Sequence, residues 1–182
     1  MKETLKKILK RHELVEIYTD AIEKEYFDVC YVTAISDNDV MLRTYNSVCE
    51  YDGYVLYPIS EITEIRLGTR YLEGRGKIIA SRQEQLTPFA IEGDLDGLGI
   101  DLFIAFLEEC QKLHNLIKVT TVHDIELCGY VEELSENALI LQQTDCDGFV
   151  DGKTIIPIDD LSKLDYDSKM LRARNSLALT HQ

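Results

Sequence analysis

An internal repeat constrains the fold of this chain more than any other feature of its sequence. Residues 31–65, YVTAISDNDVMLRTYNSVCEYDGYVLYPISEITEI, align without a gap with residues 130–164, YVEELSENALILQQTDCDGFVDGKTIIPIDDLSKL, at a constant offset of 99. Upstream, LVEIYT at residues 14–19 resembles LIKVTT at residues 116–121, at an offset of 102. A gap-free match of this length indicates two domains of one kind within the 182 residues.

Each copy is expected to fold as a row of short strands preceded by a helix. Val15 and Ile17 alternate with polar neighbours, which is typical of a half-buried strand. Residues 2–12 place apolar side chains on one helical face, and residues 98–115 do the same before the second copy. Asp96 lies just before the second helix, where its carboxylate could cap the free amide groups.

Two glycines and two prolines are predicted to mark turns at equivalent positions of the repeat. Gly53 and Gly152 each follow an aspartate, and this pair predicts a hairpin turn with a positive φ angle. Pro58 and Pro157 lack an amide hydrogen. Each proline is therefore expected where strand pairing stops, at a bend before the last strand.

These elements predict a mostly β protein with helices, built from two tandem five-stranded barrels that are each preceded by an α-helix. The first barrel and its helix are assigned to residues 1–73, and the second to residues 98–171. Residues 74–97, rich in glycine and polar side chains, are expected to form an ordered connector, and residues 172–182 a tail. Each copy has about 60 residues, which is enough for a small independent core.

The order of elements resembles the Sm-like superfamily, which includes the Sm and LSm proteins and the bacterial RNA chaperone Hfq. The resemblance covers residues 1–72 and 98–171, and the YPIS and IPID stretches before the last strand add to it. It implies a bent five-stranded barrel, although a PRC-barrel or another SH3-like barrel would leave a similar pattern. Sm-like barrels pair their edge strands with the next subunit, so the resemblance also implies a homo-oligomer.

The RNA-binding residues of this superfamily do not carry over to the chain. Hfq-type proteins read single-stranded RNA partly through a Tyr-Lys-His stretch before the bend. The equivalent residues are VLY at 55–57 and TII at 154–156, with no lysine or histidine in either copy. Tyr45, Tyr51 and Tyr54 lie near one loop and could stack on bases, but tyrosines of the barrel core and rim are the simpler interpretation.

The segment KETLKKILKR near the N-terminus is the one basic cluster that the sequence indicates in an acidic chain. Its cations are Lys2, Lys6, Lys7, Lys10 and Arg11. They are candidate contacts for RNA, an anionic membrane surface or an acidic partner. The favoured interpretation is that the helix packs on its own barrel and pairs with acidic residues of the chain, because a three-turn helix is marginal alone.

The stretch DCDGFVDG, residues 145–152, looks like a loop for a hard cation such as Ca²⁺. An EF-hand loop that starts at Asp145 needs glycine at its sixth position and glutamate at its twelfth, where this chain has Val150 and Ile156. The first copy keeps only the Asp-Gly pair of the stretch. A turn is therefore predicted here rather than a metal site.

Histidine and cysteine spacings do not predict a zinc site either. His114, His123 and Cys128 lie near one another in the sequence, but they lack zinc-finger or zinc-ribbon spacing. The five cysteines include no CxxC pair and argue against a disulfide framework, which favours a reducing cytoplasm. No metal and no cofactor are expected.

The sequence predicts a non-catalytic interaction module rather than an enzyme. It contains no GxSxG nucleophile elbow, no GxxxxGK[ST] phosphate loop and no GxGxxG motif. No apolar run approaches the ~20 residues that span a bilayer, so membrane insertion is not expected. The net charge of −14 repels phosphate backbones at long range. A protein–protein scaffold or assembly factor is therefore favoured over the alternative, RNA binding through loops or the basic helix.

Overall fold

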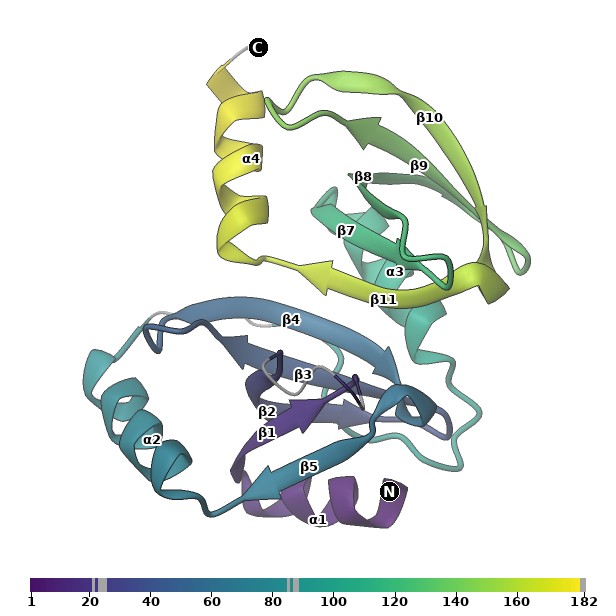
Figure 1. Ribbon diagram of the computed structural model, residues 1–182. Helices are drawn as coiled ribbons and strands as arrows, with labels where there is room; N and C mark the ends of the chain where they lie inside the picture. The colour runs from purple at the N-terminus through teal and green to yellow at the C-terminus, as the bar shows by residue number, and fades with distance from the viewer. Residues whose placement is uncertain (21, 23–25, 85, 87–88, 181–182) are drawn as a thin grey trace. The chain divides into compact units, whose positions relative to one another are not determined.

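The computed structural model describes residues 1–20, 22, 26–84, 86 and 89–180 of the chain. The chain divides into two compact units, Met1–Leu102 and Phe103–Gln182 (Figure 1). Strands hold 41% of the residues and helices 29%, so the protein is mostly β, as its sequence predicts.

The first unit, unit 1, is built around an antiparallel sheet. Its elements are α1 (Lys2–Arg11), β1 (Leu14–Tyr18), β2 (Asp28–Ile35), β3 (Asp39–Tyr45), β4 (Tyr51–Pro58), the 3-10 helix η1 (Ile59–Glu61), β5 (Glu64–Leu67), α2 (Arg70–Arg82) and β6 (Gly93–Asp94). The strand order is β4-β3-β2-β1-β5, and all neighbours in it are antiparallel. The two-residue β6 pairs with β2 in parallel.

The second unit, unit 2, repeats this order of elements. It contains α3 (Leu102–Leu113), whose first residue ends unit 1, β7 (Leu116–Thr121), β8 (Glu126–Leu134), β9 (Ala138–Thr144), β10 (Val150–Pro157), the 3-10 helix η2 (Ile158–Asp160), β11 (Leu161–Tyr166) and α4 (Lys169–Thr180). The strand order is β10-β9-β8-β7-β11, again antiparallel. Apart from the pairing of β2 with β6, each of these strands therefore has the same neighbours within its unit as its counterpart in unit 1.

The expected pair of closed five-stranded barrels is wrong. Among the described strands, the two strands at the ends of the order in each unit do not pair with each other, so neither sheet closes into a barrel. These strands are β4 and β5 in unit 1, and β10 and β11 in unit 2. The sequence could not reveal this difference, because an open sheet and a closed barrel need the same alternation of inward and outward side chains.

A helix that the sequence did not predict follows the last strand of each five-stranded order, α2 after β5 and α4 after β11. The Thr69 hydroxyl accepts a hydrogen bond from the Leu72 amide at 3.1 Å at the start of α2, and the Ser168 hydroxyl accepts one from the Leu171 amide at 3.2 Å at the start of α4. Both leucines are buried. Most of α2 was expected to lie in the 74–97 connector, and most of α4 in the 172–182 tail.

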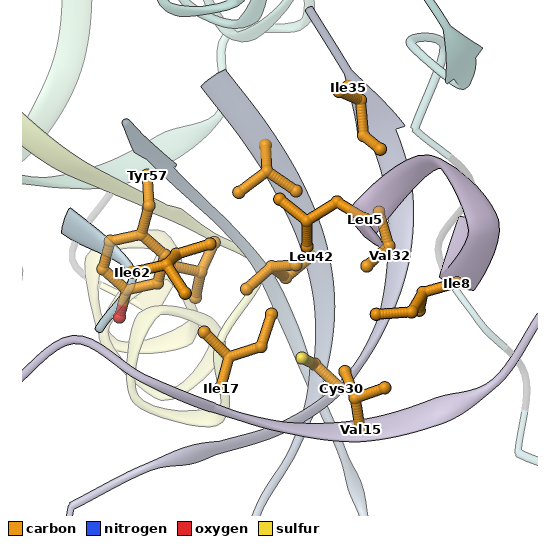
Figure 2. Close-up of a cluster of buried hydrophobic side chains, with 12 residues drawn as sticks. Leu5, Ile8, Val15, Ile17, Cys30, Val32, Ile35, Leu42, Tyr57 and Ile62 are labelled. Carbon is orange, nitrogen blue, oxygen red and sulfur yellow. The ribbon is translucent and has the colours of Figure 1, made fainter. Parts of the chain in front are cut away.

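The core of unit 1 joins α1 to the strands. Leu5 and Ile8 extend from α1 into a buried cluster that includes Val32 and Leu42 (Figure 2). The helix ends where His12 adopts a left-handed conformation, with φ 50° and ψ 46°. A helix was predicted over residues 2–12, and its apolar face packs as expected.

Gly53 and Gly152 have the positive φ angles that the sequence predicts, 86° and 87°, but they do not lie in hairpin loops. Each lies within a strand, β4 or β10, at a shift in pairing register with the neighbouring strand. One extra residue on the glycine strand forms a β-bulge, which glycine accommodates without a steric penalty. The hairpin loops are residues 46–50 and 145–149.

Pro58 and Pro157 close the strands β4 and β10. A 3-10 helix follows each proline, and the amide of the next residue, Ile59 or Ile158, donates to the main-chain oxygen of Asn38 or Asn137. The proline itself has no amide hydrogen to donate, so strand pairing ends there.

Candidate functional site

The structure divides the basic cluster of α1 into two groups. Lys2 Nζ lies 2.6 Å from Asp96 Oδ1, and Lys6 contacts the other oxygen of the same carboxylate. Lys2 is also 3.5 Å from Asp37, and Lys6 is 3.5 Å from Asp94. Hydrogen bonds from the two lysines hold the pKa of Asp96 well below its usual range. This half of the cluster therefore serves contacts within unit 1.

The predicted role of Asp96 as a helix cap is wrong. The helix α3 begins at Leu102, whereas the carboxylate of Asp96 lies between Lys2 and Lys6. The position of Asp96 in the sequence indicates only the next helix along the chain. It does not indicate two lysines that lie at least 90 positions earlier.

The rest of the basic cluster faces solvent. Lys7 and Lys10 are exposed, and within the described part of the chain neither forms an ion pair, whereas Arg11 lies 3.5 Å from Glu13. A pocket of about 580 Å³ runs beside α1 and includes Lys7, Lys10 and also Glu92 in its lining. The surface around the available lysines therefore carries both signs of charge.

The helices α2 and α4 are two further basic segments, which the sequence did not predict. The helix α2 carries one anion, Glu73, and four cations, which are Arg70, Arg75, Lys77 and Arg82. The helix α4 carries no anion and three cations, which are Lys169, Arg172 and Arg174. Counting charge over short windows along the whole chain would have found both segments. The N-terminal helix is thus not the only basic helix of this acidic chain.

Two arginines of α2 hold the hairpin loop between β3 and β4. Arg75 donates to the main-chain oxygens of Asn46 and Ser47 at 3.1 and 2.9 Å, and Arg82 donates to that of Val48 at 2.8 Å. A planar guanidinium suits such multiple carbonyl contacts. These two cations therefore stabilise the loop, and they are less available to a partner than Arg70 and Lys77.

The tyrosines that could have stacked on bases lie inside the protein. Tyr45, Tyr51 and Tyr54 are all buried. Tyr54 packs against Tyr51, with ring centroids 6.1 Å apart, and against Phe89 at 5.6 Å. A stacking platform must present the face of its ring to solvent. In this conformation the three rings contribute to packing, as the simpler interpretation has it.

The aspartate-rich stretch 145–152 contains the predicted turn at its beginning. Asp145 Oδ1 accepts hydrogen bonds from the amides of Asp147 at 3.0 Å and Phe149 at 2.9 Å. This arrangement is an Asx turn, for which aspartate is favoured without any metal. Within the described residues, no group of three or more histidine, cysteine or acidic side chains is placed to hold a metal ion.

Asp39 is a buried carboxylate at the start of β3. Its amide donates to Ser36 Oγ at 3.1 Å, and the Ser36 hydroxyl lies 3.2 Å from Asp39 Oδ2. Burial, and secondly the charge of Asp101, raise the pKa of Asp39 to about 6. The equivalent residue of unit 2 is Ala138, so only unit 1 has this group.

The raised pKa of Asp39 predicts a stability that falls as pH rises from about 4 to 6. In the unfolded chain an aspartate loses its proton near pH 4, whereas in the folded state Asp39 keeps it to about pH 6. The folded state binds more protons in this window, so the free energy of unfolding decreases as the pH increases. In urea titrations at several pH values across this window, the free energy of unfolding should change less with pH in Asp39→Asn than in the natural protein. Equal slopes would contradict the assignment.

Two strands present exposed edges. In unit 2, β10 pairs only with β9 among the described strands, and its Val150 and Ile155 are 60% and 70% exposed. Its counterpart in unit 1, β4, is almost entirely buried. In unit 1, β5 pairs only with β1 in the described sheet, and Leu67 is 45% exposed. Exposed edges of this kind are templates for pairing with another chain.

No protein-family model matches the chain, and no curated protein matches its sequence. In the part of the chain that the structure describes, none of the helices has the length and apolar character needed to cross a membrane.

Proposed function

We propose that the protein is an interaction module that associates with a second copy of itself, the β10 edge of one copy pairing with the β5 edge of the other. The observation that carries this proposal is the exposure of β10, with Val150 and Ile155 facing solvent on a strand paired on one side. The bulge at Gly152 protects the beginning of that edge, because bulges disrupt regular pairing. The regular stretch 153–156 is left as the pairing segment.

Local charge does not oppose pairing at these edges, although the whole chain is acidic. The β5 strand carries Glu64 and Arg66, and β10 carries Asp151 and Lys153, so each edge is locally neutral. Two copies with a net charge of −14 repel each other at long range, and salt screens this repulsion. Main-chain hydrogen bonds and apolar contacts supply the attraction. Self-association should therefore strengthen with added salt.

Light scattering of the purified protein tests the proposal. We expect a native mass at least twice the 20.8 kDa of one chain, and a return to one chain in Ile155→Lys, because an edge lysine opposes strand pairing. The matched control is Val122→Lys, a substitution of a loop residue in the same unit that is 54% exposed. The control should keep the oligomer. A monomeric natural protein, or an oligomer that Ile155→Lys leaves unchanged, would refute pairing through β10.

RNA binding through Lys7 and Lys10 is the second candidate function. Its support is that these two lysines are exposed and form no ion pair among the described residues. The same light-scattering peak distinguishes the candidates, because bound RNA raises the ratio of absorbance at 260 nm to that at 280 nm. RNA binding weakens with salt, whereas the proposed self-association strengthens.

The reducing cytoplasm is the compartment that we propose for this function. All five cysteines are free thiols, and four of them are buried. An oxidising compartment favours disulfides in small domains. In an oxidising compartment, the exposed Cys146 of one copy would be free to form a disulfide with that of another.

A further inference from the structure

The helices α2 and α4 each carry two exposed, large and mostly apolar side chains at equivalent positions. On α2, Tyr71 and Ile78 are 42% and 46% exposed, and on α4 the equivalent Met170 and Leu177 are 43% and 45% exposed. Within each helix the two residues are seven positions apart, which places them on one side, two turns from each other. A small residue lies between the two, Gly74 on α2 and Ala173 on α4. We name these two surfaces the α2 face and the α4 face.

The two copies of the repeat have diverged at and around these faces, but the paired positions stay large and mostly apolar and the position between them stays small. Glu73 of α2 corresponds to Arg172, and Lys77 corresponds to Ser176, so neighbouring positions have changed charge. A single exposed apolar residue is normal and needs no explanation. Large, mostly apolar side chains at equivalent positions, exposed to a similar degree in two diverged copies, indicate that both faces contact something.

The α2 face contains an anchor that is already held in place. The guanidinium of Arg75 lies 4.5 Å from the centroid of the Tyr71 ring, and the ring of Phe27 packs edge-on against it at 5.8 Å. Arg75 is itself fixed by the carbonyls of the β3–β4 loop. A tyrosine held in this way loses little conformational entropy on binding, and tyrosine is enriched at the centres of protein interfaces.

We infer that each face binds one amphipathic helix of a protein partner, and that acidic residues flank the apolar stripe of that helix. The apolar pair at a spacing of seven fits the spacing of anchors in helix recognition, and the small residue between them lets the partner backbone approach closely. Acidic flanks are indicated because both helices are basic within an acidic chain, and Arg70 and Lys77 are exposed beside the α2 face. The chain would therefore bind two such helices, independently of β10 and β5.

A synthetic peptide tests this inference on the full chain. The probe is a fluorescein-labelled helix of about 20 residues, roughly 30 Å long, with leucine along one stripe and glutamate on both flanks. Its control replaces every glutamate with lysine. We expect two bound glutamate peptides per chain, with a Kd on the order of 10⁻⁵ to 10⁻⁴ M, weakening as salt is added. Failure of the glutamate peptide to bind, or equal binding of the lysine peptide, would overturn the inference.

Paired substitutions assign the two sites. Tyr71→Glu with Ile78→Glu should leave one peptide per chain, Met170→Glu with Leu177→Glu should also leave one, and all four together should leave none. The matched control is Leu98→Glu, at a residue that is 64% exposed outside both faces, and it should keep two sites. Melting temperatures should change little for Met170→Glu with Leu177→Glu, because these residues are exposed, and should fall modestly for the variant that loses the contacts of Tyr71 with Arg75 and Phe27. A stoichiometry that stays at two in the four-residue variant would place the peptide elsewhere and refute the faces.

Discussion

Gly129→Ala is expected to lower the free energy of unfolding by about 3 kcal/mol, at the upper end of the range for overpacking. Gly129 lies in β8, where a Cβ atom would overlap the main-chain oxygen of Gln142 and come within 2.8 Å of Leu141 Cγ. A backbone oxygen cannot move aside as the end of a flexible side chain can, so the ladder between β8 and β9 must shift. Thermal or urea unfolding measures the loss.

The matched control for Gly129→Ala is Gly74→Ala. Gly74 lies in α2, and a Cβ atom there would meet nothing within 4 Å. Alanine is a better helix former than glycine by up to about 1 kcal/mol, so this variant should be slightly more stable than the natural protein. The two substitutions add the same methyl group and should have opposite effects. A Gly129→Ala variant as stable as the natural protein would contradict the close approach of β8 and β9.

The sequence predicted the strands of each unit because the apolar period of two survives in both copies. It did not predict whether the sheets close, since closure depends on pairing between the first and last strands and leaves the pattern within each strand unchanged. It misplaced the turn glycines for a related reason. Gly53 and Gly152 need a positive φ angle, and a hairpin turn and a β-bulge meet that need equally well.

The helix α2 was missed because its local composition argues against a helix. Gly74 and Gly76 both lie in it, and each glycine disfavours a helix relative to alanine. The Thr69 cap and the burial of Leu72 offset this preference, as tertiary context often does. Comparison with the second copy contained the missing signal, because Thr69 and Leu72 correspond to Ser168 and Leu171 at the same offset of 99.

The candidate contacts of α1 illustrate a different limit of the sequence. The five cations of the helix were found correctly, but their partners could not be read from the chain. Lys2 and Lys6 contact Asp96, which lies far away in sequence and among many other acidic residues. Only the parallel pairing of β6 with β2 and the packing of α1 bring these groups together.

Leu5→Ala is expected to lower the free energy of unfolding by about 2–5 kcal/mol, the range for deleting a fully buried leucine side chain. The ten-residue α1 is too short to persist alone, so its buried face must hold it on the sheet. The comparison variant is Asp96→Asn, which removes the common partner of Lys2 and Lys6. Ion pairs near solvent contribute little. Urea unfolding should therefore show a much larger loss for Leu5→Ala, and equal losses would mean that the ion pairs hold α1 as strongly as its apolar face does.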